Sequence, residues 1–409
     1  MNDRTKIEIL REEIAIPRIV QQKAEEAYAI IREQNDRTGN AREQRKEKPK
    51  EDVKKGLHNI KMIKSRKMIP LVAVMAMLLA GAVVAAGTKW SAGISEKWQV
   101  EEARKESLQQ EGAVSFAMQS QTQNGITITA EQSITDNYSV YIAFRVDGYG
   151  LREGLSPGFE EMQVTVDGMD GINYSAGFFD GLVTGEDGIL EYADGTAVIQ
   201  DKEGAIVSRY DREDGSMTYW ISMTESERGW ALDRDIHVEL KNLCGYEDKA
   251  GEIDPESIIT GVWNFGWNLQ GTENRKEWEG RMPLGDSGAV ICRVELSPIS
   301  GYVECDWPRQ REVRQAVGPE GEVREISRWV RAPRMSGVRL KDGTEYPYLF
   351  SGDGSEGYVS SEQESIRYYA CRGCERLIEP EQVEGLFFEG AEGEFYEVML
   401  EAGSLTDCP

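Results

Sequence analysis

The sequence predicts a mainly β protein in which two β-sandwich modules follow one membrane-spanning helix and a short helical tail. Three observations support this fold class. Residues 69–87 form an apolar run without a charge, the chain is basic before this run and acidic after it, and apolar residues alternate with polar ones from Ala113 onward. A period of two is typical of strands, and short strands separated by turn residues are typical of a sandwich.

The apolar run, IPLVAVMAMLLAGAVVAAG, predicts a transmembrane helix, which we assign to residues 68–87. A helix needs about 20 such residues to cross a hydrocarbon core of about 30 Å, and it satisfies its own backbone groups there. Pro70 falls in the first turn and Trp90 at the headgroup layer. The alternatives are a buried core helix, which would normally carry a polar face, and a signal peptide, which would begin near residue 1.

Charge predicts the orientation of this span. Residues 1–67 hold 18 Lys and Arg against 12 Asp and Glu, a net charge of +6. The whole chain has a net charge of −25, so the residues after 67 carry −31. Because the basic side of a single span stays in the cytoplasm, we expect the tail inside and the acidic part outside, in a cell membrane. A net charge of −31 argues against a nucleic-acid partner for the outer part.

A short amphipathic helix is predicted in the cytoplasmic tail, residues 1–67. Its apolar positions recur at a spacing of three to four: Ile16, Ile19, Val20, Ala24, Ala27, Tyr28 and Ile31. A lone helix of this length is marginal in water, so the stripe is expected to bind the tail's own flanking segment, the lipid of the inner leaflet, or a cytosolic protein. Residues 35–51 hold almost no apolar side chain and are predicted to be a disordered tether.

Beyond the span, residues 88–112 are predicted to form a stalk helix, residues 113–275 a first sandwich and residues 276–409 a second. A hairpin is expected around Asp136 and Asn137. Strands are expected at 125–130, 140–146, 162–166, 218–223, 236–240, 261–270, 290–296, 303–307, 338–340, 366–370, 385–388 and 395–400. The absence of strand–helix alternation argues against a doubly wound fold, and no internal repeat is evident.

Four cysteines suggest disulfides. Cys292 and Cys305 are equidistant from Pro298–Ile299 and would face each other in one hairpin, so a cross-strand disulfide is a hypothesis. Cys371 and Cys374 form a lone CxxC, for which a tight disulfide is favoured over a zinc site that would need further ligands. Free thiols are the alternative for both pairs.

No catalytic, metal or cofactor site is predicted. Gly154–Gly158 spells GxSxG, but Pro157 removes the N–H that a nucleophile elbow requires after the serine. His237 alternates with apolar neighbours and is expected on the surface. Arginines from Arg309 to Arg339 form a locally basic stretch, which we expect to be a solvated, salt-bridged loop because glutamates lie between them; an anionic wall polymer or lipid is the alternative.

The order of basic tail, span and stalk, followed by NGITITAEQSITDNYSVYIAFRV, GVWNFGWNLQG and VELSPISGYVE, resembles the domain-of-unknown-function 4179 family of bacterial membrane proteins. The resemblance implies immunoglobulin-like outer domains and an anti-sigma-factor-like regulator whose tail holds an extracytoplasmic-function sigma factor. The tail lacks the His and Cys pattern of zinc-containing anti-sigma domains. The rival interpretation is an envelope protein that binds wall or ligand and uses its tail only as an anchor. An exported hydrolase is disfavoured because no positioned nucleophile or metal set appears.

Overall fold

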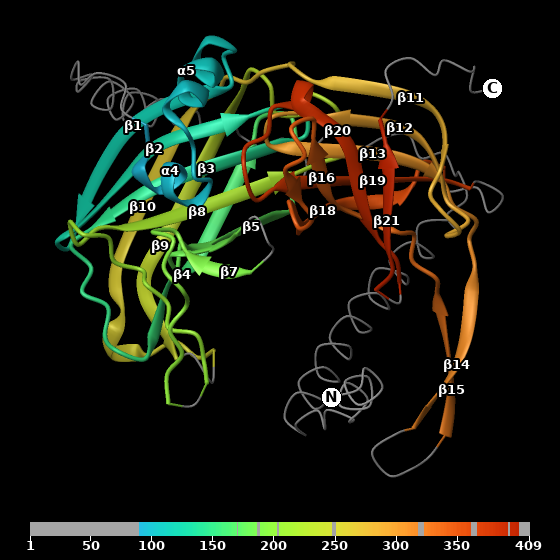
Figure 1. The fold of residues 1–409 in the computed structure, drawn as a ribbon. Helices are drawn as coiled ribbons and strands as arrows, with labels where there is room; N and C mark the ends of the chain where they lie inside the picture. Colours follow the sequence, from blue (N-terminus) through green and yellow to red (C-terminus); the bar gives the residue numbers. More distant parts are fainter. Residues whose placement is uncertain are drawn as a thin grey trace, which may run out of the picture. The chain divides into compact units, whose positions relative to one another are not determined.

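The computed structural model describes residues 90–169, 171–185, 189–202, 204–247, 251–317, 323–360, 366–391 and 393–400. These residues belong to one compact unit of the chain and are mainly β, arranged in several sheets (Figure 1). The predicted tail helix and the predicted span at 68–87 lie outside the described residues. Within the described ranges, no helix is both long and apolar enough to cross a bilayer.

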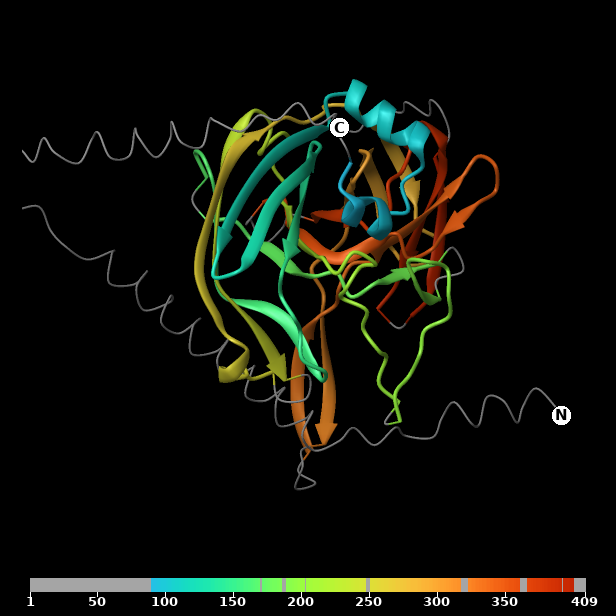
Figure 2. The same cartoon turned by 90° about the vertical axis from the view of Figure 1, so that its left-hand side faces the viewer.

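Two short helices precede the strands. They are α4 (Ala92–Lys97) and α5 (Glu102–Gln110), in the segment predicted as one stalk helix. Gln99 between them has a φ of 48°, in the left-handed region that ends a helix, so the chain turns there. Figure 2 shows both helices against the first strands of the fold.

The first set of strands forms two antiparallel sheets. The strands are β1 (Val114–Gln123), β2 (Ile126–Thr135), β3 (Ser139–Asp147), β4 (Leu155–Val166), β5 (Tyr174–Phe178), β8 (Met217–Thr224), β9 (Arg234–Glu247) and β10 (Ile259–Leu269). One sheet has the order β1-β2-β3-β8-β5 and the other β10-β9-β4. A small hairpin of β6 (Leu182–Thr184) and β7 (Leu190–Tyr192) is inserted between β5 and β8, and the 3-10 helix η1 (Pro255–Ser257) precedes β10.

The second set repeats this arrangement. Its strands are β11 (Lys276–Pro283), β12 (Val290–Leu296), β13 (Ser300–Asp306), β16 (Arg334–Leu340), β17 (Glu345–Tyr346), β18 (Phe350–Tyr358), β19 (Arg367–Cys374), β20 (Val383–Glu389) and β21 (Phe395–Met399). The sheets have the orders β11-β12-β13-β19-β18 and β17-β16-β20-β21. A hairpin of β14 (Arg311–Val317) and β15 (Val323–Trp329) is inserted between β13 and β16, and η2 (Pro380–Gln382) precedes β20.

The two sets of sheets therefore share one topology. In chain order, β1-β2-β3, β4, β5, β8, β9 and β10 correspond to β11-β12-β13, β16, β18, β19, β20 and β21. Each pairing in the first set has its counterpart in the second, to which β17 adds one edge strand beside β16. The sequence showed no repeat because few equivalent residues are identical. The turn Asp136–Ser139 corresponds to Ser297–Ser300, and both close with the same backbone hydrogen bond, from the first N–H to the fourth C=O, at 3.0 and 2.9 Å.

Each set encloses its own hydrophobic core, consistent with a β-sandwich. The first core draws on both sheets, with Phe144, Ile221, Val238 and Trp263 among its buried residues. The second is built in the same way around Val294, Met335, Leu386 and Phe388. We call the two units the first and the second sandwich. Aromatic and β-branched residues dominate because a pleated surface packs them well.

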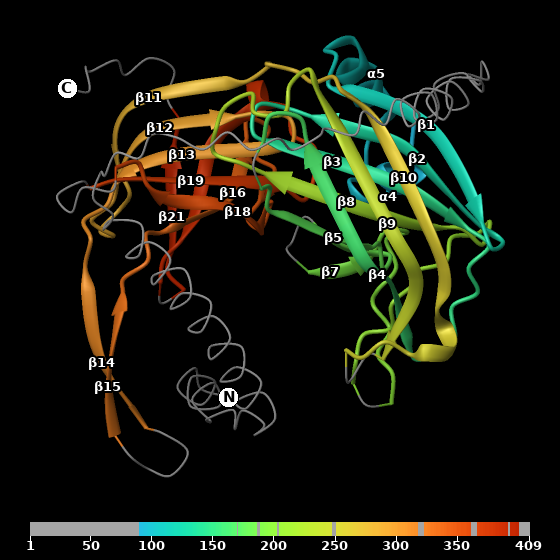
Figure 3. The same ribbon diagram turned by 180° about the vertical axis from the view of Figure 1, so that it is seen from behind.

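Every strand expected from apolar alternation is present, since those residues face a core. The expected turn at Asp136–Asn137 is also present, between β2 and β3. The arginine-rich stretch differs from the expectation of a loop. Its larger part forms the β14–β15 hairpin, with Arg311 opposite Trp329 and Val317 opposite Val323. Figures 1 and 3 show this hairpin extending away from the other strands.

Side-chain amides connect two edge strands of the first sandwich. Gln119, Gln121 and Gln123 of β1 each donate to a carbonyl of β10 and accept from an N–H of the same β10 residue, at Gly266, Asn264 and Val262 respectively. Asn124 also donates to the carbonyl of Thr260 at 2.7 Å. We call these four residues the amide ladder. It occupies backbone groups of β10 that an edge strand would otherwise leave open.

Candidate functional site at the junction of the sandwiches

The segment that leads from the predicted span into the fold packs against both sandwiches. Ile94, Trp98 and Leu108 are buried in one cluster with Tyr141 of the first sandwich and Ile299 of the second. The Ser91 backbone N–H donates to Gln132 Oε1 at 2.8 Å. The segment predicted as a stalk helix is thus packed against the fold, and residues 91–110 are held by apolar burial as well as by hydrogen bonds.

A glycine allows α4 to lie close to the first sandwich. A Cβ at residue 93 would lie 2.3 Å from Cγ2 of Thr218 in β8, a distance that no side chain tolerates. The helix is also held by Glu96, which pairs with Arg212 at 2.5 Å. On its other side, Lys97 pairs with Glu375 of the second sandwich at 3.1 Å. Helix α4 therefore joins the two sandwiches.

The two equivalent turns meet at a buried carboxylate, Asp136. Its Oδ1 accepts from the N–H groups of Tyr138 and Ser139 in its own turn, at 3.0 and 2.9 Å. Its Oδ2 accepts from the N–H of Ile299 in the other turn at 2.9 Å, and the Ser300 hydroxyl donates to both oxygens. One carboxylate thus organises its own turn and binds the equivalent turn of the second sandwich.

Aromatic pairs occupy equivalent positions on either side of this contact. Tyr141 stacks with Trp220 in the first sandwich at 6.2 Å, and Tyr302 stacks with Tyr369 in the second at the same distance. The outer face of Tyr302 is covered by Tyr138 of the first sandwich, at 5.0 Å and 9°. Tyr141 is covered instead by Trp98 of α4, at 4.4 Å.

Different residues cover Tyr141 and Tyr302 because Ile299 stands at the position equivalent to Tyr138. The register of the turns makes Ile299 the counterpart of Tyr138, and a two-fold relation between the sandwiches would place Ile299 over Tyr141. Ile299 does share a buried cluster with Tyr141, but its side chain is smaller than tyrosine. Trp98 fills the remaining space, so α4 completes the contact between the sandwiches.

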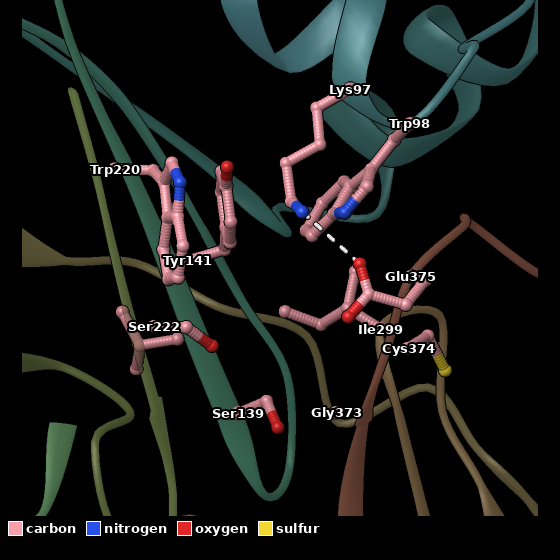
Figure 4. A pocket seen from close by; sticks show the side chains of 11 residues that line it. Lys97, Trp98, Ser139, Tyr141, Trp220, Ser222, Ile299, Gly373, Cys374 and Glu375 are labelled. Atoms are coloured by element: carbon pink, nitrogen blue, oxygen red, sulfur yellow. Dashed lines mark hydrogen bonds and ion pairs between the residues drawn. The ribbon is translucent and has the colours of Figure 1, made fainter. Parts of the chain in front are cut away.

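A small cavity remains beside these residues, lined by Lys97, Trp98, Tyr141, Trp220, Ile299 and Glu375 among others (Figure 4). Its volume is about 30 Å³, which is the space of about one water molecule. Sites for small organic ligands are about ten times larger or more. The cavity is therefore too small for an organic ligand.

A second buried carboxylate, Glu295 of β12, lies at the same junction. It is fully buried and is surrounded by three arginines: Arg293 at 2.5 Å, Arg275 at 3.2 Å, and Arg228 from the first sandwich. Arg228 also accounts for the position of Tyr138, whose hydroxyl it approaches at 3.4 Å. Ion pairs across the junction fix orientation, because breaking one leaves a buried charge without its partner.

Burial sets the electrostatics of the carboxylates that hold α4 and the turns. It raises the pKa of Asp136 above its usual value, against the lowering effect of its hydrogen-bond donors. Burial also raises the pKa of Glu131, whose carboxylate accepts from the Ser91 hydroxyl at 2.6 Å. The pKa of Glu96 is raised for the same reason, although Arg212 opposes the shift.

The CxxC disulfide hypothesis does not agree with the strand geometry. Cys371 and Cys374 both lie in β19, and side chains three residues apart in a strand project to opposite faces. Cys371 packs with Tyr138 and Tyr302 at the junction, whereas Cys374 belongs to the second core. Both residues are thiols in the structure, and burial raises both pKa values well above the usual range.

The expected pairing of Cys292 with Cys305 is shifted by one residue. The hairpin of β12 and β13 exists, but a bulge between Ile291 and Arg293 places Ile291 opposite Cys305. A bulge adds a residue to one strand, so the symmetric count from Pro298–Ile299 does not describe this register. Both side chains are buried, and burial raises the pKa of Cys305 to about 12, an effect to which Cys292 stays close enough to contribute.

Such thiols are poor nucleophiles, because the thiolate is the reactive form. Within the described ranges, no group of three or more His, Cys, Asp and Glu residues is arranged to hold a metal ion. His237 is exposed on β9, and Ser156 of the GxSxG match lies within β4, not in a strand-to-helix elbow. Chemistry of these kinds has no support in the described part of the chain.

The predicted partner-binding residues, from Ile16 to Ile31, lie outside the described residues. Sequence reasoning missed the junction itself, because Asp136 and Ile299 are 163 positions apart. One signal was present: the strand that follows the Asp136–Asn137 turn is apolar on both faces. Residues Val140 to Phe144 of β3 are all buried, so both faces of this strand are covered.

Comparisons with known proteins give little to add. No family model matches the chain, and no curated protein matches it. Among solved structures, a conserved domain protein from Bacillus anthracis aligns at 12% identity over 70% of this chain and 92% of its own, with a TM-score of 0.37. The C-terminal domain of the Streptococcus agalactiae AgI/II polypeptide BspA aligns at 12% identity over 66% and 86%, with a TM-score of 0.12. Both TM-scores are too low to indicate a shared fold.

Proposed function

We propose that this chain is a single-pass membrane regulator, anti-sigma-factor-like, with its N-terminus in the cytoplasm. In this proposal the two sandwiches are immunoglobulin-like, lie outside the cell and sense or relay a signal. The apolar stripe of the tail binds a cytosolic protein, and an extracytoplasmic-function sigma factor is the candidate partner. The basic tail, the apolar run at 68–87 and the acidic remainder support this topology.

One structural observation carries the relay. Residues 91–110 directly follow the predicted span, and they are packed against both sandwiches at their junction. A change in how the sandwiches meet would alter the contacts of Trp98 and Lys97, and through them the chain that enters the membrane. The cavity described at this junction, with a volume of about 30 Å³, is too small for an organic ligand, which is in keeping with a relay.

Capture of partners by the full chain tests the proposal. Tagged full-length protein is cross-linked in living cells, solubilised and purified, and the attached proteins are identified. The variant Ile19→Asp/Tyr28→Asp places two charges on the predicted apolar stripe and is expected to lose its cytosolic partner about tenfold or more. Gln22→Asp/Ala29→Asp adds the same charge on the opposite face of the predicted helix and should keep the partner.

The result that overturns the proposal is equally concrete. If the native chain recovers no cytosolic protein, or if both variants recover the same amount of it, the tail is not a docking helix. The rival, an envelope protein that uses its tail as an anchor, would then be favoured. If a protease added to intact cells spares the sandwiches, the predicted topology is wrong.

A further inference from the structure

The exposed apolar side chains of this protein are concentrated in the two inserted segments. Each insertion carries a group of exposed large aliphatic or aromatic residues. In the β14–β15 hairpin these are Val313, Val323, Ile326 and Trp329, and in residues 179–216 they include Leu190, Ile199, Ile206 and Val207. Exposed apolar groups of this kind are typical of interaction surfaces.

The β14–β15 hairpin is a two-stranded sheet of its own. In the described part of the chain its strands pair with each other and with no further strand. Its connections to the second sandwich are at its base, where Trp307 Nε1 donates to the carbonyl of Val330 at 3.4 Å and the Arg309 guanidinium donates to the carbonyl of Ser360 at 2.8 Å. A two-stranded ribbon in water is marginally stable, so a partner that covers one face would stabilise it.

The faces of this hairpin differ. By register, Val313, Val323 and Trp329 share one face, and the guanidinium of Arg311 lies 4.2 Å from the Trp329 ring centroid. Val313 is 62% exposed and Trp329 is 54% exposed. An exposed Trp with a stacked Arg is the kind of anchor that dominates protein interfaces.

The two insertions carry opposite charge. Residues 309–334, the hairpin and its base, hold seven Arg and four Glu, a net +3. Residues 179–216 hold ten Asp and Glu against three Lys and Arg, a net −7. Opposite potentials steer two surfaces together and fix their register.

We propose that the β14–β15 hairpin of one copy docks on the acidic insertion, residues 179–216, of a second copy of this chain. Each copy carries one of each surface, so a two-fold dimer forms the same hairpin-to-insertion contact twice. Hairpin-to-hairpin pairing would bring two positive segments together. An anionic lipid surface would match the hairpin but would leave the apolar residues of the acidic insertion uncovered.

Cysteine cross-linking of full-length chains in their own membranes tests this dimer. Val313→Cys is introduced in a chain with one tag and Ile199→Cys in a chain with another; the two are produced together and treated with a short bis-maleimide. Both substituted positions are exposed, so folding is expected to be unaffected. A dimer that carries both tags is expected, at several times the yield of the parent pair with native cysteines only. Five of those native cysteines are buried.

Two controls make the outcome specific. Met118→Cys is also exposed but lies on β1, outside either insertion, and should give the parent yield when paired with Val313→Cys. Arg309→Glu/Arg311→Glu in the Val313→Cys chain should lower the mixed dimer several-fold, as should high salt. The proposal is overturned if the mixed dimer does not exceed these backgrounds, if Val313→Cys cross-links chiefly to itself, or if anionic vesicles alone protect Val313→Cys from labelling.

Discussion

The Tyr141–Trp220 pair of the first sandwich and the Tyr302–Tyr369 pair of the second lie on equivalent strands, yet different elements cover them. Tyr138, from the first sandwich itself, covers Tyr302, whereas Trp98 of α4 covers Tyr141. A repeated framework thus presents two similar aromatic surfaces, and the segment that precedes β1 occupies one of them. The comparison shows how a duplicated fold can bind an additional element without changing its strand order.

The two sandwiches also differ in their edge strands and in their inserted segments. The first sandwich connects β1 to β10 through the amide ladder, whereas β11, with the sequence KEWEGRMP, offers no glutamine for such contacts. The first sandwich carries an acidic insertion and the second a basic hairpin. Frameworks conserve backbone topology, and loops and insertions carry the differences.

Removing the two covering side chains should give the largest effect. Trp98→Ala deletes a buried indole and is expected to lower the free energy of unfolding by about 3–5 kcal/mol. Hydrogen exchange should rise in α4 and β3 and stay unchanged in β19. Tyr138→Ala, the matched variant, should raise exchange in β13 and β19 instead. Equal changes in all four elements after either substitution would show that the two aromatic surfaces are not separate.

Asp136→Asn should weaken the contact between the turns. The amide would place an N–H₂ group against the N–H donors of one turn, so a buried donor is left unpaired, at a cost of about 3 kcal/mol. Urea unfolding should then separate into two transitions, one for each sandwich. Asp342→Asn is the matched control, since Asp342 accepts from the Thr344 N–H in an exposed turn. A single transition at unchanged stability would contradict the role of Asp136.

The smallest effect concerns pH. Because burial raises the pKa of Glu131 in the folded chain, its contribution to stability is present below the unfolded value of about 4.3 and is lost as pH rises through the folded value. Glu131→Gln should therefore be more stable than the native chain at pH 7, by a margin that narrows toward pH 4. Thermal unfolding measures this, with the exposed Glu252→Gln as control. A margin that widens on acidification would reverse the sign.

Apolar alternation was sufficient to predict the strands that face a core, such as β3 and β12. It failed for strands stabilised in other ways. In β1 the residues that face β10 are glutamines, in β14 and β15 arginines alternate with exposed valines, and β18 is rich in glycine. The shared topology was not visible in the sequence because too few equivalent residues are identical. In the turns, Ser139 and Tyr141 match Ser300 and Tyr302, but the equivalents of Asp136 and Tyr138 are Ser297 and Ile299.

The candidate site was less accessible to sequence reasoning. Asp136 could be placed in a turn, but its donors on Ile299 and Ser300 come from a turn in the other sandwich, and no local pattern specifies that contact. The Cys292–Cys305 hypothesis assumed a regular pairing of two strands, which a bulge at Cys292 interrupts. The CxxC hypothesis did not foresee that β19 continues through both cysteines, which places their side chains on opposite faces. The span and the docking helix remain predictions.

The amide ladder has a mechanical consequence. Tension applied along the chain from residue 90 would first load α4 and α5 and then β1, which is the edge strand of its sheet. Pulling β1 away would break its backbone bonds to β2 and the glutamine bonds to β10 together. The amide ladder therefore resists the opening of the first sandwich, so that force applied through residue 90 should displace the two helices before it separates β1 from β2 and β10.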